Sequence, residues 1–257
     1  MELEVVPGKT EREYPVTSVT IATPAYTGRV TVEFMNSLAK TITDLGYYKI
    51  PWRMIAAVGD SLIARSRNTL TAMFLESDSS HLMFLDDDMA FPGWGVRKLL
   101  FNDKAIVGTA YKTRKVTAPK YTCSFFDNEE KTVTIEGKTG CCKVKNIATG
   151  CVLMHRSIFE TLIKNEVVIK YDIEESFDKF NKWNYLFYDV GVINGKYWGE
   201  DFGLCNKLRD AGIDIWLDTT FTPGHVAQTV MEGDIKEIFK KKEEAHADIQ
   251  ICGPASA

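Results

Sequence analysis

The chain of 257 residues lacks the usual marks of a secreted or membrane-spanning protein. No apolar run approaches the roughly 20 residues that cross a bilayer. The start, Met1–Val5, has neither the basic nor the apolar segment of a signal peptide. The formal net charge of −4 gives no overall attraction to nucleic acid or anionic membranes, although a local basic patch is compatible with it. We therefore expect a cytoplasmic protein without a membrane span.

The cysteines form no pattern typical of a structural metal site or a disulfide framework. They stand at 123, 141, 142, 151, 205 and 252. No pair has Cys-x-x-Cys spacing, and the adjacent Cys141 and Cys142 suit neither a simple disulfide nor a zinc site. Free thiols in a reducing compartment are the better interpretation. With 45% hydrophobic and 26% charged residues, the composition is that of a globular chain long enough to bury a large core.

The stretch His81–Met89 is the most informative part of the sequence. His81–Leu85 is apolar without Gly or Pro, which predicts a strand buried on both faces. It ends in three carboxylates, Asp86, Asp87 and Asp88. Adjacent carboxylates repel one another and lose solvation when buried, so they tend to lie near water or a cation.

The three acids are compatible with a metal site. Alternate residues of an extended segment point the same way, so we expect Asp86 and Asp88 to converge while Asp87 points elsewhere. Two carboxylates beside a crevice suit Mg²⁺ or Mn²⁺, which is usually shared with substrate phosphates. The alternative is an acidic turn that only solvates a loop, but the buried strand before it favours the metal.

The chain up to these acids alternates between strand and helix patterns. The expected elements, in order, are Val16–Thr23, 30–45, Arg53–Val58, Ser61–Glu76 and 81–86. This βαβαβ order with short links predicts a mostly parallel sheet with helices on both faces. The strand exits Thr23–Tyr26, Asp60 and Asp86–Asp88 then meet at one edge, where open α/β sheets bind their ligands.

The expected helix 61–76 carries two arginines that could contact a ligand. With Ser61 as its N-cap, it should bury the apolar residues Leu62, Ile63, Leu70, Met73 and Phe74. Arg65 and Asn68 then fall on the opposite face with Ser61, and Arg67 at the flank. The two arginines can serve a phosphate-bearing ligand, and a solvated basic face is an equally open interpretation.

Shorter patterns follow. Helices are expected at 94–101, 156–164 and 204–211, strands at 105–110, 144–147, 151–154 and 213–217, and a hairpin of 121–126 with 132–135. The aromatic and charged segment 165–198 has weak periodicity, typical of a substrate-covering loop or a surface excursion. A charged helix is expected at Asp234–Asp248.

Three motifs occur in a recognisable order: Arg67-Asn68 on a helix, a strand ending Phe84-Leu85-Asp86-Asp87-Asp88, and Glu200-Asp201 at a helix start. Over roughly residues 17–226 the chain resembles the GT-A fold nucleotide-sugar glycosyltransferases, nearest to glycosyltransferase family 2. The resemblance implies a Rossmann-like α/β fold with a smaller antiparallel, acceptor-side portion. It also implies one domain over 1–230, followed by a C-terminal helix and tail over 231–257. Two departures are a slightly long spacer before Asp86 and a reduced turn, Gly59-Asp60-Ser61.

The resemblance also implies roles for individual residues. The donor would be bound by Thr23, Ala25, Tyr26, Asp60, Arg65, Arg67, Asp86 and Asp87. The ligands of Mn²⁺ or Mg²⁺ would be Asp86, Asp88 and His225, although a loop histidine is an equal alternative for the last. The acceptor would be bound by Trp198, Gly199, Thr149 and Gly150. Asp201 would be the general base, with Glu200 beside it.

The implied activity is metal-dependent transfer of a sugar from a UDP- or GDP-sugar to a hydroxyl of a glycan or another acceptor, nucleic acid not excluded. Inversion with Asp201 as base is expected, although an acid at a helix start is also favoured by the macrodipole alone. A sugar-phosphate nucleotidyltransferase is a weaker alternative because Thr23–Gly28 lacks a Gly-rich phosphate loop. A non-catalytic glycan- or nucleotide-binding protein of this fold is disfavoured by the presence of Asp86, Asp88 and Asp201 together.

Overall fold

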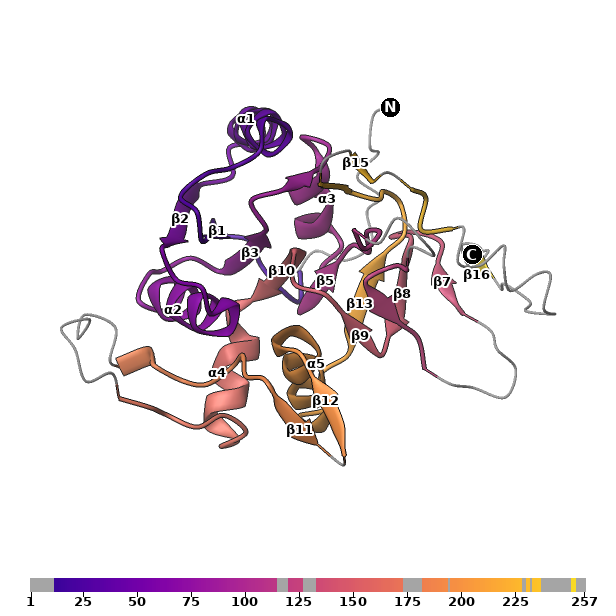
Figure 1. Cartoon of the computed structure of the whole chain (residues 1–257). Coiled ribbons are helices and arrows are strands. Elements are labelled where there is room, and N and C mark those ends of the chain that lie inside the picture. The colour runs from indigo at the N-terminus through magenta and orange to yellow at the C-terminus, as the bar shows by residue number, and fades with distance from the viewer. Residues whose placement is uncertain are drawn as a thin grey trace.

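The computed structural model describes residues 12–114, 120–126, 133–172, 182–193, 195–227, 230–231, 233–236 and 251–252. Its centre is a seven-stranded sheet in the order β2-β1-β3-β10-β5-β13-β8 (Figure 1). In chain order these strands are β1 (Val19–Ala25), β2 (Trp52–Val58), β3 (His81–Leu85), β5 (Ile106–Gly108), β8 (Cys141–Val144), β10 (Cys151–His155) and β13 (Ile215–Asp218).

The strand directions confirm the expected mostly parallel sheet. Strands β2 and β3 both pair in parallel with β1, and β13 pairs in parallel with β5. Strand β10 runs antiparallel to its neighbours β3 and β5, and β8 runs antiparallel to β13. The exits of β1, β2, β3, β5 and β13 therefore lie along one edge of the sheet, which is where the three acids follow β3.

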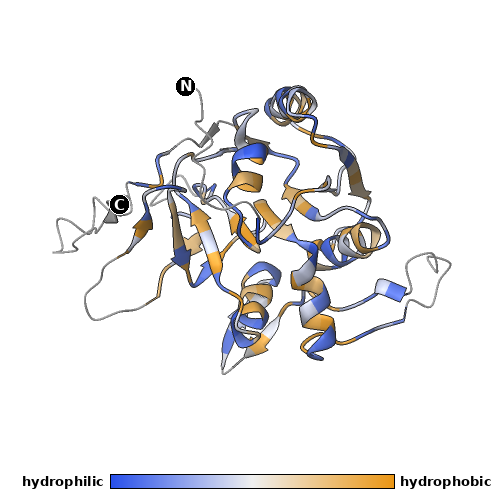
Figure 2. Ribbon diagram, turned by 180° about the vertical axis from the view of Figure 1, so that it is seen from behind, coloured by the Kyte–Doolittle hydropathy of each residue, from blue (hydrophilic) through white to orange (hydrophobic). Residues whose placement is uncertain are grey.

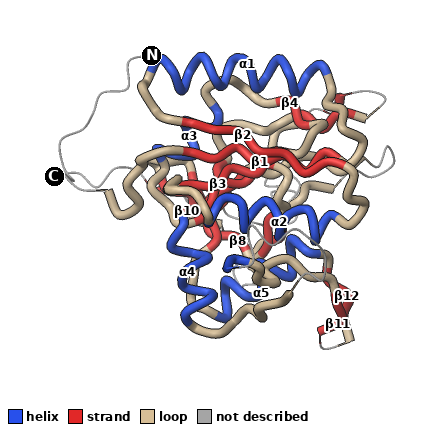
Figure 3. The backbone as a smooth tube through the Cα atoms, turned by 90° about the vertical axis from the view of Figure 1, so that its left-hand side faces the viewer, coloured by secondary structure: helices blue, strands red, loops and turns tan. Residues whose placement is uncertain are grey.

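Helices cover both faces of this sheet, as expected. They are α1 (Val32–Tyr47), α2 (Ile63–Leu75), α3 (Gly95–Phe101), α4 (Arg156–Lys164) and α5 (Glu200–Asp210). One buried cluster joins α2, α4 and α5 to the sheet, and a second joins α1 and α3 to the opposite face (Figure 3). The fold class is α/β. Within the described parts of the chain, no helix has both the length and the apolar character needed to span a bilayer.

Strand β3 is buried on both faces, as its sequence predicts. Leu82 and Phe84 belong to the cluster under α2, α4 and α5, whereas Met83 and Leu85 belong to the other cluster. All four are fully buried, and each contributes roughly 1.5–3 kcal/mol through removal of its side chain from water. Figure 2 shows the central strands largely in apolar orange, while the helices alternate between orange and blue.

Four small sheets accompany this central sheet among the described residues. They pair β4 (Met89–Ala90) with β14 (Gly224–Val226) and β14 with β15 (Val230–Met231), β6 (Cys123–Ser124) with β9 (Asn146–Ile147), β7 (Ile135–Glu136) with β16 (Ile251–Cys252), and β11 (Gly191–Ile193) with β12 (Lys196–Trp198). The expected hairpin of 121–126 with 132–135 is wrong, because its two halves pair with β9 and β16 instead. The expected strand 144–147 is divided between β8 and β9.

The expected cap of helix 61–76 is wrong, and its expected buried face is confirmed only in part. Leu70 and Phe74 are fully buried, as expected, whereas Ile63 is 39% exposed. The N-cap of α2 is Leu62, and its N–H is bonded by the carboxylate of Asp60, at 2.9 Å, rather than by Ser61. Leu62 is 58% exposed, whereas Arg67 and Asn68 are buried. The helix therefore turns polar groups inward, towards partners that lie far away in the sequence.

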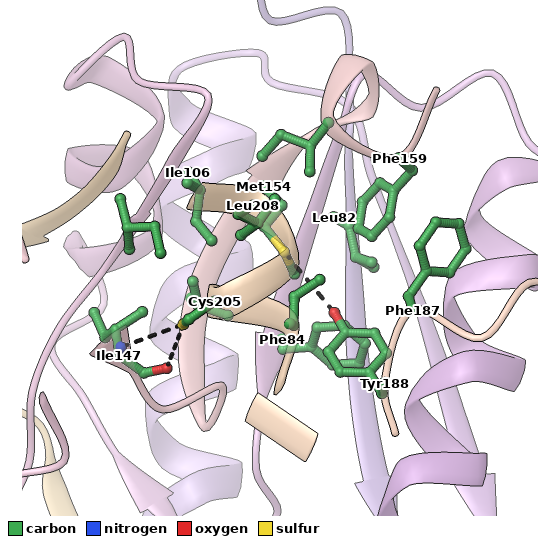
Figure 4. Packing of buried hydrophobic residues seen from close by; sticks show 14 of the residues in the cluster. Leu82, Phe84, Ile106, Ile147, Met154, Phe159, Phe187, Tyr188, Cys205 and Leu208 are labelled. Carbon is green, nitrogen blue, oxygen red and sulfur yellow. Dashed lines mark hydrogen bonds between the residues drawn. The ribbon is translucent and has the colours of Figure 1, made fainter. Parts of the chain in front are cut away.

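The segment 165–198 is not a surface excursion throughout. Phe187 and Tyr188 are fully buried, and the side chain of Asn68 bonds the N–H and the C=O of Tyr188 at 3.0 and 2.7 Å. Figure 4 shows Tyr188 beside Phe84, with its hydroxyl directed at the sulfur of Met154. A substrate-covering loop was the other expectation for 165–198 and stays a prediction, because residues 173–181 and 194 lie outside the described residues.

Near the C-terminus, the structure reaches beyond the expected domain boundary at residue 230. Ile235 is fully buried in the cluster under α2, α4 and α5, and its N–H bonds the hydroxyl of Thr222 at 2.9 Å. The boundary at 230 therefore stays a prediction. Most of the expected helix 234–248 lies outside the described residues. Five cysteines are free thiols, as expected: Cys123, Cys141, Cys142, Cys151 and Cys205.

Candidate active site

The three acids after β3 form a tight turn rather than an extended segment. The N–H of Met89 bonds the C=O of Asp86 at 3.2 Å. The expectation that Asp86 and Asp88 point the same way because they alternate in a strand therefore rests on the wrong backbone geometry. Their carboxylates have different partners, Arg67 for Asp86 and Arg114 for Asp88.

Arg67 joins the turn to helix α5. Its side chain is 3% exposed, with Nη2 at 2.9 Å from Asp86 Oδ1 and Nε at 3.5 Å from Glu200 Oε1. The guanidinium also lies over the ring of Phe84, 5.2 Å from its centroid. Burial opposes the charge of Arg67, but the carboxylates of Asp86 and Glu200 outweigh it and raise its pKa above the ordinary value. A permanently charged, buried arginine thus holds two carboxylates from distant parts of the chain.

Asp201 lies in the first turn of α5, next to Glu200. Its Oδ1 accepts the N–H of Phe202 at 2.7 Å, and Gly199 is the N-cap of the helix. Burial, followed by the charge of Glu200, raises the pKa of Asp201 to about 6. A carboxylate with a pKa close to neutrality is suited to accept a proton at physiological pH.

A cavity of about 210 Å³ opens at the exits of β1, β2 and β3. Its lining includes Tyr26, Asp60, Asp86, Asp88, Arg114 and His225. Two larger cavities, of about 340 and 360 Å³, lie elsewhere and are both lined by Trp216. The smaller cavity is the candidate site because the expected convergence of strand exits occurs there.

Asp88 and His225 meet at this cavity. The pairing of β14 with β4 places His225 opposite Met89, and the N–H of Val226 bonds the C=O of Asp88 at 2.9 Å. His225 Nε2 is 3.7 Å from Asp88 Oδ2, and the guanidinium of Arg114 contacts that same oxygen. Asp88 is 8% exposed, and its Oδ1 is buried without a hydrogen-bond partner in the described parts of the chain.

His225 has the form of a metal-binding imidazole. Its Nδ1 lies 3.0 Å from the C=O of Lys112 and must therefore carry the proton, which leaves the lone pair on Nε2. That Nε2 accepts the Nε–H of Arg114 at 3.1 Å. Burial lowers the pKa of His225, so the ring is neutral at pH 7. A backbone carbonyl that orients the opposite nitrogen is the usual support of a ligating histidine.

These residues fit a divalent cation bound by two protein side chains. Among the described residues, no three His, Cys, Asp or Glu side chains gather closely enough to hold a metal ion. Mg²⁺ is nevertheless often held by one or two carboxylates together with substrate phosphates and water. Asp88 Oδ2 and His225 Nε2 lie 3.7 Å apart and are suitable donors, although Arg114 contacts both of them in this structure. Asp86 is engaged by Arg67, and its expected role as a metal ligand stays a prediction.

The other expected donor residues differ in their exposure. Tyr26 is 59% exposed at the cavity, whereas Thr23 and Ala25 are buried inside β1. Asp60 receives both Nε and Nη2 of Arg65 at 2.8 Å, and these hydrogen bonds lower its pKa. Thr23 and Ala25 are thus outside the cavity lining, and their contacts with a nucleotide stay predictions.

Asp87 contributes to the turn through its backbone. Its C=O accepts the N–H of Thr31, the N-cap of α1, at 3.0 Å. Burial, and then the charge of Asp86, raise the pKa of Asp87. The carboxylate of Asp87 lines the cavity, so a donor contact by this residue stays a prediction.

The expected acceptor residues fall into two groups. Gly150 lies against the acidic turn: its C=O accepts the N–H of Asp86 at 3.0 Å, and a Cβ here would clash with the hydroxyl of Tyr111. Thr149, beside it, is buried with an unpartnered hydroxyl in the described structure. Trp198 is half-buried at the end of β12, and its ring centroid is 6.5 Å from that of Phe202, at the start of α5. Trp198 and Gly199 are thus next to Asp201, as expected.

Arg114 and Tyr111 also belong to the site, although neither is predicted from the sequence. Both follow β5, whose exit lies on the same edge as the acids, and the ring of Tyr111 is 5.1 Å from that of His225. The basic run Lys112-Thr113-Arg114 directly after a strand was a signal that could have found Arg114. No comparable signal marks Tyr111.

No protein-family model and no curated protein sequence matches the chain. Among solved structures, a Drosophila β1,4-galactosyltransferase 7 mutant in complex with manganese, UDP-Gal and xylobiose is similar, with 11% identity and a TM-score of 0.38 over 91% of this chain and 81% of that one. Staphylococcus aureus TarS matches with 12% identity and a TM-score of 0.33, over 65% of this chain and 55% of that one. The complex of TarS with UDP matches with 12% identity and a TM-score of 0.34, over 64% of this chain and 53% of that one. These neighbours are GT-A type glycosyltransferases, the class that the motifs resemble. At these scores and identities the likeness decides nothing about the chemistry of this chain.

Proposed function

We propose that the protein is a metal-dependent glycosyltransferase that moves a sugar from a nucleoside-diphosphate sugar to an acceptor hydroxyl with inversion. The observation that carries this proposal is the link Asp86–Arg67–Glu200. It ties the acidic turn of the cavity to the helix start that presents Asp201. A group transfer needs a leaving-group side and a base side in fixed relation, and this buried arginine supplies the connection.

The cavity at the strand exits is the proposed donor site. Tyr26 offers an exposed ring for a nucleobase, and Asp60 an acceptor for ribose hydroxyls. Asp88 and His225 would hold Mn²⁺ or Mg²⁺. Such an ion, when bound, stabilises the negative charge that develops on the diphosphate. A UDP- or GDP-sugar is the proposed donor class.

Asp201 is the proposed general base. Its carboxylate takes the proton of the acceptor hydroxyl while the hydroxyl oxygen forms a bond to the anomeric carbon. The bond between that carbon and the phosphate oxygen breaks, and its electron pair leaves with the nucleoside diphosphate. Attack from the face opposite the leaving group inverts the anomeric configuration. Glu200 is held by Arg67 and would orient the acceptor or the base.

The acceptor site is proposed beside α5. Trp198 lies just before Gly199 and Asp201, and the hairpin of β11 and β12 exposes Val192 and Tyr197 at 69% and 73%. Exposed aromatic and apolar side chains next to a base suit stacking against a sugar ring or another flat acceptor. A glycan is the proposed acceptor, and a nucleic acid hydroxyl fits the same surface.

Two further features complete the proposal. The five free cysteines suit a reducing compartment, which supports a cytoplasmic location. A single domain over 1–230 with a C-terminal tail agrees with the two core clusters lying on the two faces of one sheet.

The test is a panel of nucleotide sugars with and without Mn²⁺, read first by thermal shift and then by product analysis. A specific donor should raise the melting temperature only with the metal, because a ligand that binds the native state stabilises it by mass action. With an acceptor present, NMR should show a product of inverted anomeric configuration. Release of pyrophosphate from a nucleoside triphosphate would instead indicate the nucleotidyltransferase, and binding without turnover the non-catalytic alternative.

A further inference from the structure

The guanidinium of Arg114 lies at the position that a divalent cation would take. It contacts Asp88 Oδ2 through Nη2, and it donates from Nε to His225 Nε2 at 3.1 Å. A carboxylate oxygen and an imidazole lone pair are the atoms through which these side chains bind metals. Arg114 and a cation therefore need the same two acceptor atoms.

The three side chains differ in how firmly they are held. Asp88 is buried and hydrogen-bonded to Val226 through its backbone, and His225 is fixed by the C=O of Lys112. The side chain of Arg114, by contrast, is 51% exposed, against 12% for that of Asp88. Asp88 and His225 thus form a fixed receptor, and Arg114 reaches into it from the solvent side.

A buried carboxylate needs a counter-ion, and Arg114 provides one in the absence of metal. An unpaired carboxylate at this depth would be strongly unfavourable. When a divalent cation binds Asp88, it supplies that charge and repels the guanidinium at close range. Arg114 then remains at the rim of the same cavity, where the diphosphate of the donor would lie, and a guanidinium binds phosphate with two parallel hydrogen bonds.

We propose that Arg114 is an exchangeable counter-ion: it competes with the divalent cation for Asp88 and His225, and once displaced it binds the diphosphate of the donor. The inference rests on the proposed function for the identity of the donor. It predicts effects of opposite sign when Arg114 is replaced. Binding of the metal alone becomes tighter, and binding of the nucleotide to the metal-loaded protein becomes weaker.

The first measurement is the dissociation constant of Mn²⁺ without nucleotide, from the electron paramagnetic resonance signal of free Mn²⁺ and from calorimetry. Arg114→Gln should bind Mn²⁺ about tenfold tighter than the wild type, equivalent to about 1.4 kcal/mol. Arg65→Gln is the matched control: it also removes one arginine charge, but the partner of Arg65 is Asp60, another acid that lines the cavity. Its effect should be much smaller. Arg114→Lys keeps the charge but cannot form two parallel hydrogen bonds, so its affinity for Mn²⁺ should lie between those of the wild type and Arg114→Gln.

The second measurement is the affinity for UDP and GDP at saturating Mn²⁺, for whichever of the two the wild type binds. Arg114→Gln should bind the nucleotide about tenfold more weakly than the wild type, because it lacks a charge-assisted contact to phosphate. The pair of opposite changes in one variant is the signature of exchange. A purely structural role for Arg114 would weaken both affinities together.

Each other outcome overturns a defined part of the proposal. Equal Mn²⁺ affinity in the wild type, Arg114→Gln and Arg65→Gln would overturn the competition and leave the proposed function standing. An unchanged nucleotide affinity would overturn the transfer of Arg114 to the diphosphate. If neither the wild type nor Arg114→Gln binds Mn²⁺, the exchange fails and the metal dependence of the proposed function fails with it.

Discussion

Asp201 and Glu200 are adjacent acids whose surroundings give them different roles. Glu200 faces the guanidinium of Arg67 at 3.5 Å, so its charge is compensated. Asp201 forms no ion pair with Arg67 in the described parts of the chain, and burial raises its pKa to about 6. Two neighbouring carboxylates with separated environments are a recurrent arrangement of catalytic sites. Their adjacency at a helix start was visible in the sequence, but the division of roles depends on Arg67, which lies far earlier in the chain.

The first prediction concerns Asp201 as the base. Asp201→Asn should lower kcat by about 10²–10⁴-fold, because the amide cannot accept the proton. Donor affinity should stay near that of the wild type, since the lost interaction belongs to the acceptor side. Wild-type kcat should rise with pH through about 6, as the base loses its own proton. Asp210→Asn, at the other end of α5, is the control and should leave kcat and its pH profile unchanged. A variant Asp201→Asn with near-normal turnover would refute the assignment.

The same raised pKa predicts an effect on stability. Because Asp201 binds its proton more tightly in the folded state, its contribution to the free energy of unfolding is present below its ordinary pKa, near 3.8, and is lost as pH rises through about 6. Asp201→Asn removes this loss. The stability of the variant relative to the wild type should therefore rise by roughly 2–3 kcal/mol between pH 4 and pH 7.5. Urea unfolding at both pH values measures it, and an equal difference at the two would contradict the prediction.

Among the secondary-structure elements, β3 and β10 meet at a closely packed junction in the site. Gly150, just before β10, accepts the N–H of Asp86, and its α-carbon leaves room for the hydroxyl of Tyr111. Only a residue without a side chain fits between them. The sequence indicated a turn at Ala148-Thr149-Gly150, but not which side chains approach it.

Gly150→Ala tests this packing. The new methyl group would displace Tyr111 or Asp86, with a loss of about 1–3 kcal/mol in the free energy of unfolding and a weakened donor affinity. Gly46→Ala, inside α1 with nothing within 4 Å of the added Cβ, is the matched control. It should stabilise the protein by about 0.5–1 kcal/mol and leave donor binding unchanged. Urea unfolding and calorimetry separate the two, and equal behaviour of both variants would rule out the close approach at Gly150.

Helix α2 shows what periodicity could not predict. Its apolar residues suggested one buried face, but the structure buries Arg67 and Asn68 and exposes Leu62. Arg67 pairs with Asp86, 19 residues away, and Asn68 with the backbone of Tyr188, 120 residues away. Helical periodicity contains no information on such distant partners. The location of the helix was therefore predictable, and its orientation was not.

Replacement of Arg67 should destabilise the protein far more than replacement of Arg65. Arg67→Ala leaves the carboxylates of Asp86 and Glu200 without their buried partner, and we expect a loss of about 3–5 kcal/mol in the free energy of unfolding. Arg65→Ala removes a solvent-exposed ion pair and should cost little. Chemical denaturation of both variants tests the difference. Similar small losses for the two would show that the link from Asp86 to Glu200 contributes no stability.

At the scale of the whole molecule, the convergence of strand exits was the strongest inference from the sequence, and it is confirmed. Alternating strands and helices fix the direction of β1, β2 and β3, and with it the edge where Asp60 and the three acids lie. The antiparallel β10 in the middle of the sheet, and the small sheet that carries His225 to Asp88, were not predicted. They depend on the pairing of β10 with β3 and β5 and of β14 with β4, which are segments far apart in the sequence, and a single sequence offers no local signal for such pairings.

That whole-molecule arrangement predicts that donor binding and stability are linked through Asp88. In the wild type, a UDP- or GDP-sugar with Mn²⁺ should raise the melting temperature. At a ligand concentration of 100 times Kd, the free energy of unfolding should increase by about 2.7 kcal/mol. Asp88→Ala should abolish this metal-dependent gain, because it removes the carboxylate that lies 3.7 Å from His225. His225→Ala should weaken this gain, since one of two protein ligands is lost.

Asp214→Ala is the control for Asp88→Ala. Asp214 is an exposed acid remote from the cavity that pairs with Lys143, so this variant should respond like the wild type. If calorimetry finds the same donor affinity with EDTA as with Mn²⁺, the cation plays no part, and Arg114 alone remains to balance the charge of Asp88.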